Sequence, residues 1–426
     1  MRQLLTAHPR SVITIAAGLV VMLGVGVAVL YIGGDHTLSA AATRPTAAPS
    51  VSPSSTDGPT ATASPSVAPT PSATPSPTVD PTPTPTPTPT PPSCVNVASM
   101  PISQQVNQLI MVSGDFSNVG ASAAYARAGV GGFVFFGQPA AGSGPRISAG
   151  LAGLFNDARA SGQILPWTST DEEGGYVARL SNLIGSLPAP RWMAANWTPA
   201  HVQSVITAHA RAMWNLGITM DLAPVVDTAL PSNTIADEAD RSFSFDPHTA
   251  ATYGVAFANG LHAGGVVAVA KHFPGFGQAN ANTDLSPATD PSLAELQGRD
   301  LIPFEQAIAN GVPVIMITHA SVPGLTGSVP ASLSPATYQY LRNTLHFNGV
   351  TLTDSLSAVA ITDYYSQPAA AVKAVEAGAD MVMIQDTAWQ GTLTALQNAV
   401  ASGALPAAQL NASVTRILTA KSIATC

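Results

Sequence analysis

A lysine and a histidine stand where a strongly apolar run of the chain ends. The run is VVAVA at 266–270, and Lys271 and His272 follow it directly as the start of KHFPGFG. A buried strand has no need of such a pair at its end, and the two glycines and the proline cost conformational freedom unless the loop holds something in place. The loop continues to the polar run NTD at 282–284. A base, a carboxyl group and hydrogen-bond donors that follow one strand indicate the pocket of an enzyme.

The chain contains eight apolar runs of this kind, and amphipathic or alanine-rich stretches of helical length lie between them. This alternation indicates parallel strands joined by helical crossovers. The expected strands are LIMVSGD (109–115), GFVFFG (132–137), LPWTSTDEEGG (165–175), ITMDLAPVVD (218–227), VVAVAKHFPG (266–275), PVIMITHA (313–320), GVTLTDS (349–355) and ADMVMIQD (379–386). The expected helices include 199–216, 247–263, 292–311, 335–346 and 366–378. Eight such units predict an α/β fold of the (β/α)8 TIM-barrel type, although an open doubly wound sheet gives a similar alternation.

The positions of the charges favour the barrel over the open sheet. In five of the runs the first ionisable residue appears only as the apolar stretch ends; these residues are Asp171, Lys271, His319, Asp354 and Asp386. In a (β/α)8 barrel the carboxyl ends of the strands meet on one face, and that face carries the active site. The alternative is that charges bound any buried strand, because a charge inside is costly. That alternative explains a single charge, but not why acids and bases gather on the C-terminal side.

We expect residues 1–40 to form an N-terminal membrane anchor or a signal segment. Positions 11–32 are apolar and uncharged, and a helix of about 20 such residues crosses a bilayer. Basic residues precede this run, so its start should remain in the cytoplasm and the rest of the chain should lie at the cell surface. A cleaved signal peptide has a shorter apolar region, about 7 to 15 residues, but the small residues at 40–42 leave cleavage and secretion open.

Residues 41–93 are predicted to be a linker. They consist mainly of proline, threonine, serine and alanine, and they include the repeat PTPTPTPTPTPP. This composition offers almost nothing to bury and cannot form a core. Alternating proline favours polyproline II, at about 3.1 Å per residue, so we expect a semi-rigid stalk between the membrane and the rest of the chain.

Residues 94–426 are long enough for one large barrel domain. The chain has two cysteines, Cys94 and Cys426, at the first and last positions of this region. An extracytoplasmic setting permits a disulfide bond between them, and two free thiols are the alternative. The net charge of −8 and the charged fraction of 9% give no basic patch, so nucleic acid is not an expected partner. The anchor and the stalk are compatible with a monomer, which we expect.

Eight segments of this region resemble a known enzyme family. In chain order they are DEEGGYVARL (171–180), LGITMDLAPVVD (216–227), RSFSFDP (241–247), KHFPGFG (271–277), MITHASVPGL (316–325), LSPATY (333–338), GVTLTDSLS (349–357) and EAGADMVMI (376–384). Together they look like the catalytic barrel of glycoside hydrolase family 3, in its single-domain bacterial branch of β-N-acetylglucosaminidases. The resemblance covers essentially all of 94–426 and implies a retaining, exo-acting glycosidase with a carbohydrate substrate. Paired carboxyl groups perform this chemistry, so no cofactor and no metal are expected.

The resemblance implies that Asp354 is the nucleophile, because it matches the family's position just past a strand end. A carboxylate held there can be fixed against the anomeric carbon of a sugar. The alternative is that Asp354 caps a helix formed by the following LSAVAI segment, since aspartate is a good N-cap.

The resemblance also implies five residues that hold the hydroxyl groups of the sugar in the −1 subsite. A carboxylate accepts hydrogen bonds from sugar hydroxyls, and arginine and lysine donate them to sugar oxygens. The five residues are Asp171, Arg179, Arg241, Lys271 and His272. Alternatively, each belongs to a buried ion pair that supports the loops. Tyr176 stands where the family often has arginine, so part of this shell differs.

The main departure from the family lies in the loop that supplies the general acid/base. The family branch commonly reads KHFPGHG followed by an Asp-Ser-His element, whose histidine is thought to carry the proton. Here Phe276 replaces the first of those histidines, and 282–284 read Asn-Thr-Asp. Asp284 is therefore the candidate acid/base, and its ordinary pKa of about 3.9 must be raised by burial or by the Asp354 charge. The alternatives are that the NTD run only caps a turn, or that Asp290 takes the role.

These observations predict a retaining exo-β-glycosidase that releases β-linked N-acetylhexosamine from cell-wall or environmental glycans by double displacement. Three alternatives stay open: a family 3 β-glycosidase of another sugar specificity, a surface glycan-binding protein that lost turnover with the histidine, and a structural adhesin on the same barrel. The adhesin hypothesis leaves the retained pocket residues unexplained.

Overall fold

The structure is a computed structural model that describes residues 94–232 and 240–426. The predicted membrane or signal segment (1–40) and the predicted linker (41–93) therefore lie outside the described residues. Among the helices that are described, none combines the length and the apolar character needed to cross a bilayer.

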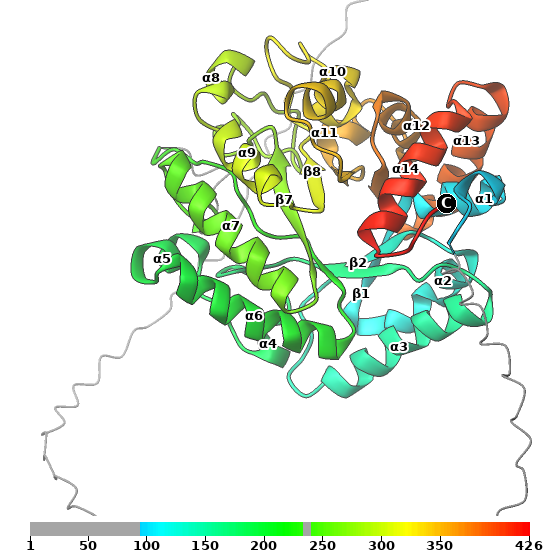
Figure 1. Ribbon diagram of the computed structural model, residues 1–426, viewed down its shortest axis with the longest axis horizontal. Coiled ribbons are helices and arrows are strands. Elements are labelled where there is room, and N and C mark those ends of the chain that lie inside the picture. The colour runs from blue at the N-terminus through cyan, green and yellow to red at the C-terminus, as the bar shows by residue number, and fades with distance from the viewer. Residues whose placement is uncertain (1–93, 233–239) are drawn as a thin grey trace, which may run out of the picture. The chain divides into compact units, whose positions relative to one another are not determined.

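Eight parallel strands close into a barrel, which confirms the (β/α)8 fold over the open sheet (Figure 1). Around the barrel the order is β1, β10, β9, β8, β7, β6, β3 and β2. Each strand lies inside one of the eight predicted runs, with the bounds β1 Ile110–Asp115, β2 Gly132–Phe136, β3 Trp167–Thr170, β6 Met220–Asp221, β7 Val267–Phe273, β8 Val314–Ile317, β9 Val350–Ser355 and β10 Met381–Ile384. A short antiparallel hairpin of β4 (Glu172–Gly174) and β5 (Val177–Ala178) follows β3. Most residues of the barrel strands are buried because both faces of the strands are covered; β8 and β10 are wholly apolar, whereas β3 reads Trp-Thr-Ser-Thr.

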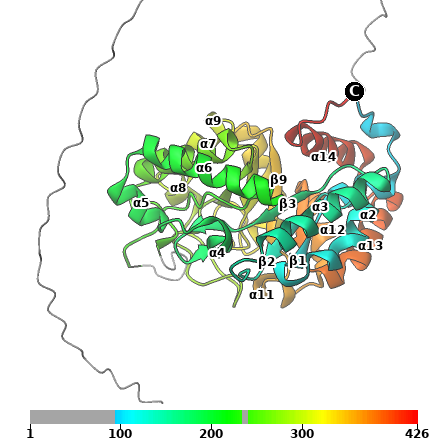
Figure 2. The ribbon, with the colours of Figure 1, turned by 90° about the horizontal axis from the view of Figure 1, so that it is seen from below.

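Helices surround the barrel, as Figures 1 and 2 show. Their bounds are α1 Ile102–Gln108, α2 Ala123–Ala128, α3 Gly144–Ala160, α4 Ser181–Ile184, α5 Pro190–Asn196, α6 Pro199–Leu216, α7 Pro247–Ala263, α8 Leu293–Gln297, α9 Leu301–Ala309, α10 Pro335–Gln339, α11 Val359–Thr362, α12 Gln367–Ala377, α13 Trp389–Ser402 and α14 Ala407–Ala420. The predicted helices 199–216 and 247–263 coincide with α6 and α7, and both begin with a proline, which suits the first helical turn.

Two other predicted helices are interrupted. The segment 292–311 forms two helices, because a capping box of Ser292 and Glu295 starts α8 and Gly298 follows its end. The segment 335–346 starts as α10 and continues as a π-helical turn at Tyr340–Thr344.

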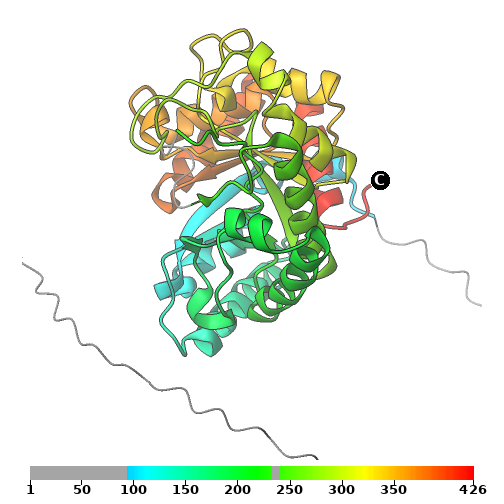
Figure 3. The same ribbon diagram turned by 90° about the vertical axis from the view of Figure 1, so that its left-hand side faces the viewer.

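The two ends of the barrel differ. Loops that carry α4 and α11 lie at one end, and α14 and the C-terminus lie at the other (Figure 2). Figure 3 shows the same division from the side, with loops coloured yellow to orange extending away from the C-terminus. These loops follow the carboxyl ends of the strands, so this is the end where a barrel of this type carries its active site.

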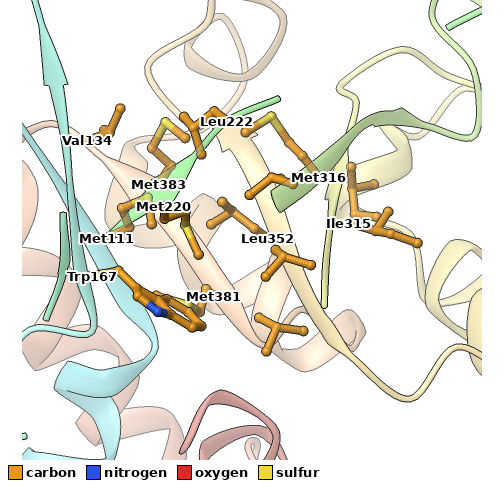
Figure 4. Packing of buried hydrophobic residues seen from close by; sticks show 14 of the residues in the cluster. Met111, Val134, Trp167, Met220, Leu222, Ile315, Met316, Leu352, Met381 and Met383 are labelled. Atoms are coloured by element: carbon orange, nitrogen blue, oxygen red, sulfur yellow. The ribbon is translucent and has the colours of Figure 1, made fainter. Parts of the chain in front are cut away.

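The barrel interior is filled with side chains, several of them methionines (Figure 4). Trp167 and Met381 start β3 and β10 and fill the end near the C-terminus, while Leu222, Met316 and Met383 lie closer to the carboxyl ends of the strands. None of these five residues is more than 4% exposed. Flexible methionine side chains fill irregular gaps well, so the barrel is a packed core and not a channel.

The last residues of the chain lie at the end of the barrel where the strands begin. Cys94 and Cys426 are joined by a disulfide bond. Nζ of Lys421 donates to the side chain of Gln108 and to two backbone carbonyl oxygens, at 2.9 to 3.0 Å. Burial lowers the pKa of Lys421 to about 7. The disulfide bond and the hydrogen bonds of the Lys421 amine together fix the C-terminal segment to the core.

Removing the disulfide bond with Cys94→Ser and Cys426→Ser is expected to lower the free energy of unfolding by about 2 to 4 kcal/mol, because the bond restricts the unfolded chain. The two cysteines are 332 positions apart, so nearly all of the barrel lies inside the closed loop. Urea unfolding of the oxidised wild type, the reduced wild type and the double variant measures the change. Superimposable curves for all three would contradict a stabilising bond.

Candidate active site

A cavity of about 430 Å³ opens at the carboxyl ends of the barrel strands. All seven predicted site residues line it: Asp171, Arg179, Arg241, Lys271, His272, Asp284 and Asp354. They stand at the ends of β3, β6, β7 and β9 or in the loops that follow, so the barrel gathers side chains that are far apart in the sequence. Another cavity, of about 440 Å³, lies between α7, α9 and the C-terminal segment, but its lining contains no carboxylate, lysine or arginine. The first cavity is therefore the candidate active site.

Lys271 is the centre of an ion-pair network on the wall of this cavity. Its Nζ lies 2.9 Å from Oδ1 of Asp171 and 2.7 Å from Oε1 of Glu173. Arg241 donates to both oxygens of Glu173, at 2.8 and 2.9 Å, and Arg179 donates to Oδ2 of Asp171 at 3.2 Å. The ion-pair role and the sugar-binding role are thus compatible, because the groups that form the network also line the cavity.

The network keeps its members charged in spite of their burial. Burial disfavours the carboxylate forms of Asp171 and Glu173, but the neighbouring cations outweigh it, so the pKa of each acid is lowered. Burial also disfavours the charged form of Lys271, yet the two carboxylates raise the pKa of its amine. Charged donors and acceptors that are already in place suit the binding of sugar hydroxyl groups.

His272 is held by an aspartate that the sequence did not single out. Oδ2 of Asp227 lies 2.7 Å from Nδ1 of His272. Oδ1 of Asp227 accepts the backbone N–H groups of His272, at 3.1 Å, and of Phe276, at 2.7 Å. The carboxylate holds a proton on Nδ1, which leaves Nε2 for another partner. Asp227 follows the apolar run of a predicted strand, and this position is the signal that would have identified it.

Two buried acids that do not line the cavity, Glu172 and Asp221, hold the β4–β5 hairpin in place. Glu172 accepts the N–H of Leu180 at 2.7 Å and lies 3.1 Å from Nε2 of His209. Asp221 accepts the N–H of Glu172 at 2.9 Å, and burial, together with the Glu172 charge, raises the pKa of Asp221 well above its ordinary value. Of the two adjacent glutamates, Glu173 therefore lines the cavity and Glu172 supports the hairpin.

Asp354 lies near the end of β9 and lines the cavity. Its Oδ1 accepts the N–H of Ser355 at 2.7 Å. The buried His319 fixes this strand end, because its Nε2 lies 2.8 Å from the carbonyl oxygen of Ser355 and its Nδ1 lies 2.7 Å from the hydroxyl of Ser332. The N-cap of the next helix, α11, is Ala358. Asp354 is therefore not a helix cap, and its carboxyl group is available to the cavity.

Asp284 lines the cavity, whereas its competitor Asp290 does not. The side chain of Asn282 caps the turn by accepting the N–H of Asp284 at 2.8 Å, so the Asp284 carboxyl group is not used as the cap. Asp284 is an exposed residue at the mouth of the loop, but the cavity walls remove part of the water around its carboxyl group. This partial loss of water and the nearby Asp354 charge raise the pKa of Asp284. Asp290 is buried, and neither of its carboxyl oxygens has a hydrogen-bond partner within the described part of the chain.

Phe276 makes one wall of the cavity apolar. Its ring meets the ring of His272 edge-on, with 5.7 Å between the centroids. Its side chain packs with Ala279, Ala288 and Ala320 in a small buried cluster. A phenyl ring cannot transfer a proton, so this position contributes shape and not acid/base chemistry.

Comparisons with known proteins show which family the chain belongs to. Residues 101–420 match the family model of the glycosyl hydrolase family 3 N terminal domain. The chain belongs to glycosyl hydrolase family 3. Over 262 residues it is 39% identical to the β-hexosaminidase LpqI of Mycobacterium tuberculosis, a match that covers 59% of this chain and 67% of that protein. The resemblance found in the sequence is confirmed.

Two solved structures of the family are similar along most of the barrel. A glycosyl hydrolase of family 3 from Mycobacterium smegmatis has 35% identity and a TM-score of 0.70, and the match covers 76% of this chain and 98% of that one. A family 3 β-N-acetylglucosaminidase from Paenibacillus has 29% identity and a TM-score of 0.70, and the match covers 76% of this chain and 62% of that one.

Asp227→Asn is expected to lower kcat/KM of this glycosidase about 10- to 100-fold, the range for partners that orient a functional histidine. Asparagine keeps the shape but lacks the charge that holds the proton on Nδ1 of His272. Rates on a chromogenic glycoside and circular dichroism separate loss of function from loss of fold. Asp246→Asn, at an exposed helix N-cap away from the cavity, is the control. An unchanged kcat/KM in Asp227→Asn would rule out the orienting role.

Proposed function

We propose that the chain is a retaining β-N-acetylhexosaminidase in which Asp354 is the nucleophile and Asp284 is the general acid/base. The observation that carries the proposal is that both carboxyl groups line one cavity in contrasting surroundings. Asp354 stands at a strand end braced by His319. Asp284 stands on a turn where its pKa is raised, which favours the protonated form that a general acid needs. Two carboxyl groups with separate roles are the usual machinery of glycosidases.

In the first step Asp284 gives its proton to the glycosidic oxygen while the bond from C1 to that oxygen breaks. A carboxylate oxygen of Asp354 forms a bond to C1, and the leaving group departs as an alcohol. In the second step the Asp284 carboxylate takes a proton from water, and the water oxygen attacks C1. The ester bond breaks and Asp354 recovers its electron pair, so two inversions restore the β configuration.

The five remaining site residues bind the hydroxyl groups of the −1 sugar. Asp171, Arg179, Arg241 and Lys271 present charged acceptors and donors, and His272 presents the ring nitrogen that Asp227 does not hold. Below them Leu222, Met316 and Met383 close the cavity with an apolar floor. A glycan therefore enters by its end, which accords with an exo-acting enzyme.

The N-acetylhexosamine assignment rests on the relatives, which include a β-hexosaminidase and a β-N-acetylglucosaminidase. We further assign residues 94–426 as the catalytic domain, 41–93 as its linker and 1–40 as a membrane anchor or signal segment. The disulfide bond between Cys94 and Cys426 supports a location outside the cytoplasm. In this proposal the enzyme acts as a monomer on glycans of the cell wall or of the surroundings.

A panel of p-nitrophenyl sugars that includes the N-acetyl-β-glucosaminide and the β-glucoside tests the proposal with the purified chain. We expect turnover of the N-acetyl-β-glucosaminide, and about a 1,000-fold or greater loss in Asp354→Asn, because no nucleophile remains. Asp284→Ala should lose about 100- to 10,000-fold and should recover part of its rate with azide, which needs no general base. Wild-type activity should fall as pH rises through the raised pKa of Asp284, and this limb should vanish in the variant.

Asp290→Asn is the control for the neighbouring buried acid. Loss of activity with azide rescue in Asp290→Asn, and not in Asp284→Ala, would move the acid/base role to Asp290. Binding of a sugar by folded protein without turnover on any member of the panel would favour the glycan-binding hypothesis. Turnover of the β-glucoside alone would show that the N-acetylhexosamine assignment is wrong, but it would be consistent with the proposed mechanism.

A further inference from the structure

A further cavity lies at the opposite end of the barrel from the candidate active site. Its volume is about 620 Å³. Trp167 and Val267 line it and are the first residues of β3 and β7, so the cavity lies where the strands begin. Its other walls come from α3, α6 and the C-terminal segment 420–423. The proposed glycosidase chemistry uses none of these residues, and a cavity of this size can hold a small organic ligand.

Three aromatic side chains give this cavity flat apolar walls. They are Phe155 of α3, Trp167, and Trp214 of α6. Trp214 is 52% exposed. Its ring lies next to Gly265, where an added Cβ atom would be 3.6 Å from the indole. The chain therefore supports one part of the Trp214 ring and leaves much of its surface open, and such walls favour a flat aromatic ligand that stacks on them.

The charged groups of the cavity wall are all positive. Among the described residues that line the cavity, Lys421 and Arg159 are cations and none is an acid. This wall differs from the chain as a whole, whose net charge is −8. Arg159 is exposed, and its guanidinium makes a long contact of 3.4 Å with the neutral side chain of Asn156. A negatively charged ligand would thus meet two positive groups and no repelling acid.

The Lys421 amine has hydrogen-bond partners but no counter-charge. Its Nζ donates to the side chain of Gln108 and to the carbonyl oxygens of Gly131 and Leu165, all of which are neutral. It lies 5.2 Å from the centre of the Trp167 ring. Within the described part of the chain no acid shifts the pKa of this amine, which loss of water lowers to about 7. An anion in the cavity would favour the charged amine through its field, even though the N–H groups are already used.

We propose that this cavity is a binding site for a small aromatic carboxylate. The ring of the ligand packs on the aromatic walls, the Arg159 guanidinium donates hydrogen bonds to the carboxylate, and the Lys421 charge attracts it. The walls favour a flat ring, and the two cations favour a carboxylate over a neutral group of similar shape. The inference does not depend on the proposed glycosidase activity, because the two cavities share no residue.

Isothermal titration calorimetry of the full chain with 2-naphthoate tests the site. We expect saturable binding with a Kd of about 10 to 100 μM, a usual affinity for a ligand of this size. The neutral 2-naphthalenemethanol has the same ring and should bind at least about fivefold more weakly. At pH 8 the binding of 2-naphthoate should take up protons, because the anion raises the pKa of Lys421 from about 7. Titrations in two buffers of different ionisation enthalpy measure this uptake.

Two exposed tryptophans supply a matched pair of variants. Trp214→Ala should weaken the binding of 2-naphthoate about tenfold or more, because it removes an aromatic wall. Trp192→Ala removes a similarly exposed tryptophan in α5, which does not line the cavity, and should leave the Kd unchanged. Lys421→Met keeps an apolar stem but lacks the amine, so it should weaken binding and abolish the proton uptake. Circular dichroism checks that each variant is folded.

Three results would overturn the site. They are no saturable binding of 2-naphthoate up to about 5 mM, equal affinity for 2-naphthalenemethanol, and an unchanged Kd in Trp214→Ala. Proton uptake that persists in folded Lys421→Met would contradict the role of this amine as the partner of the anion. Should Lys421→Met not fold, the comparison of Trp214→Ala with Trp192→Ala decides the proposal.

Discussion

The candidate active site depends on the burial of Lys271 between two carboxylates. Its side chain is 3% exposed, and Asp171 and Glu173 both lie within 2.9 Å of its Nζ. Burying any one of these charges alone costs several kcal/mol, so each is stable only because the others are present. Arg241 also binds Glu173, and Arg179 also binds Asp171, so each acid has two cationic partners. The cavity wall is therefore a single unit, and removing one partner leaves an uncompensated buried charge that costs about 3 to 5 kcal/mol.

The packed barrel explains why these charges gather where they do. Methionine, leucine and tryptophan side chains fill much of the interior (Figure 4), so a charged side chain has little room there. The charged side chains of the cavity stand instead at the carboxyl ends of the strands and in the loops that follow them. The contrast between the two proposed catalytic carboxyl groups follows from this arrangement. Asp354 belongs to a strand and has a braced backbone, whereas Asp284 belongs to a turn in the loop that follows β7.

The sequence predicts the barrel well because its strands are buried on both faces and most of them read as largely apolar runs. It also predicts the seven cavity residues, because charges end those runs and the family segments locate them. Asp227 ends a predicted strand, as several of the cavity charges do, but it was missed because its contact with His272 leaves no motif in the sequence. The two supporting roles of His319 and Glu172 depend on partners that are 36 and 37 positions away, and only folding brings them together. The predicted helix 292–311 is split because a capping box at Ser292 and a glycine at 298 bound a short helix inside one amphipathic stretch, which hides the break from the apolar periodicity.

The central claim is that Asp354 forms a covalent bond to the sugar. A 5-fluoro N-acetyl-β-glucosaminyl fluoride slows both chemical steps, but its fluoride leaves readily, so the glycosyl-enzyme should accumulate. Mass spectrometry of the treated chain should then show one added fluorinated sugar, and fragmentation should locate it on the peptide that contains Asp354. Asp354→Asn should remain unlabelled under the same conditions. A label on another residue would contradict the account, as would labelling that persists unchanged in Asp354→Asn.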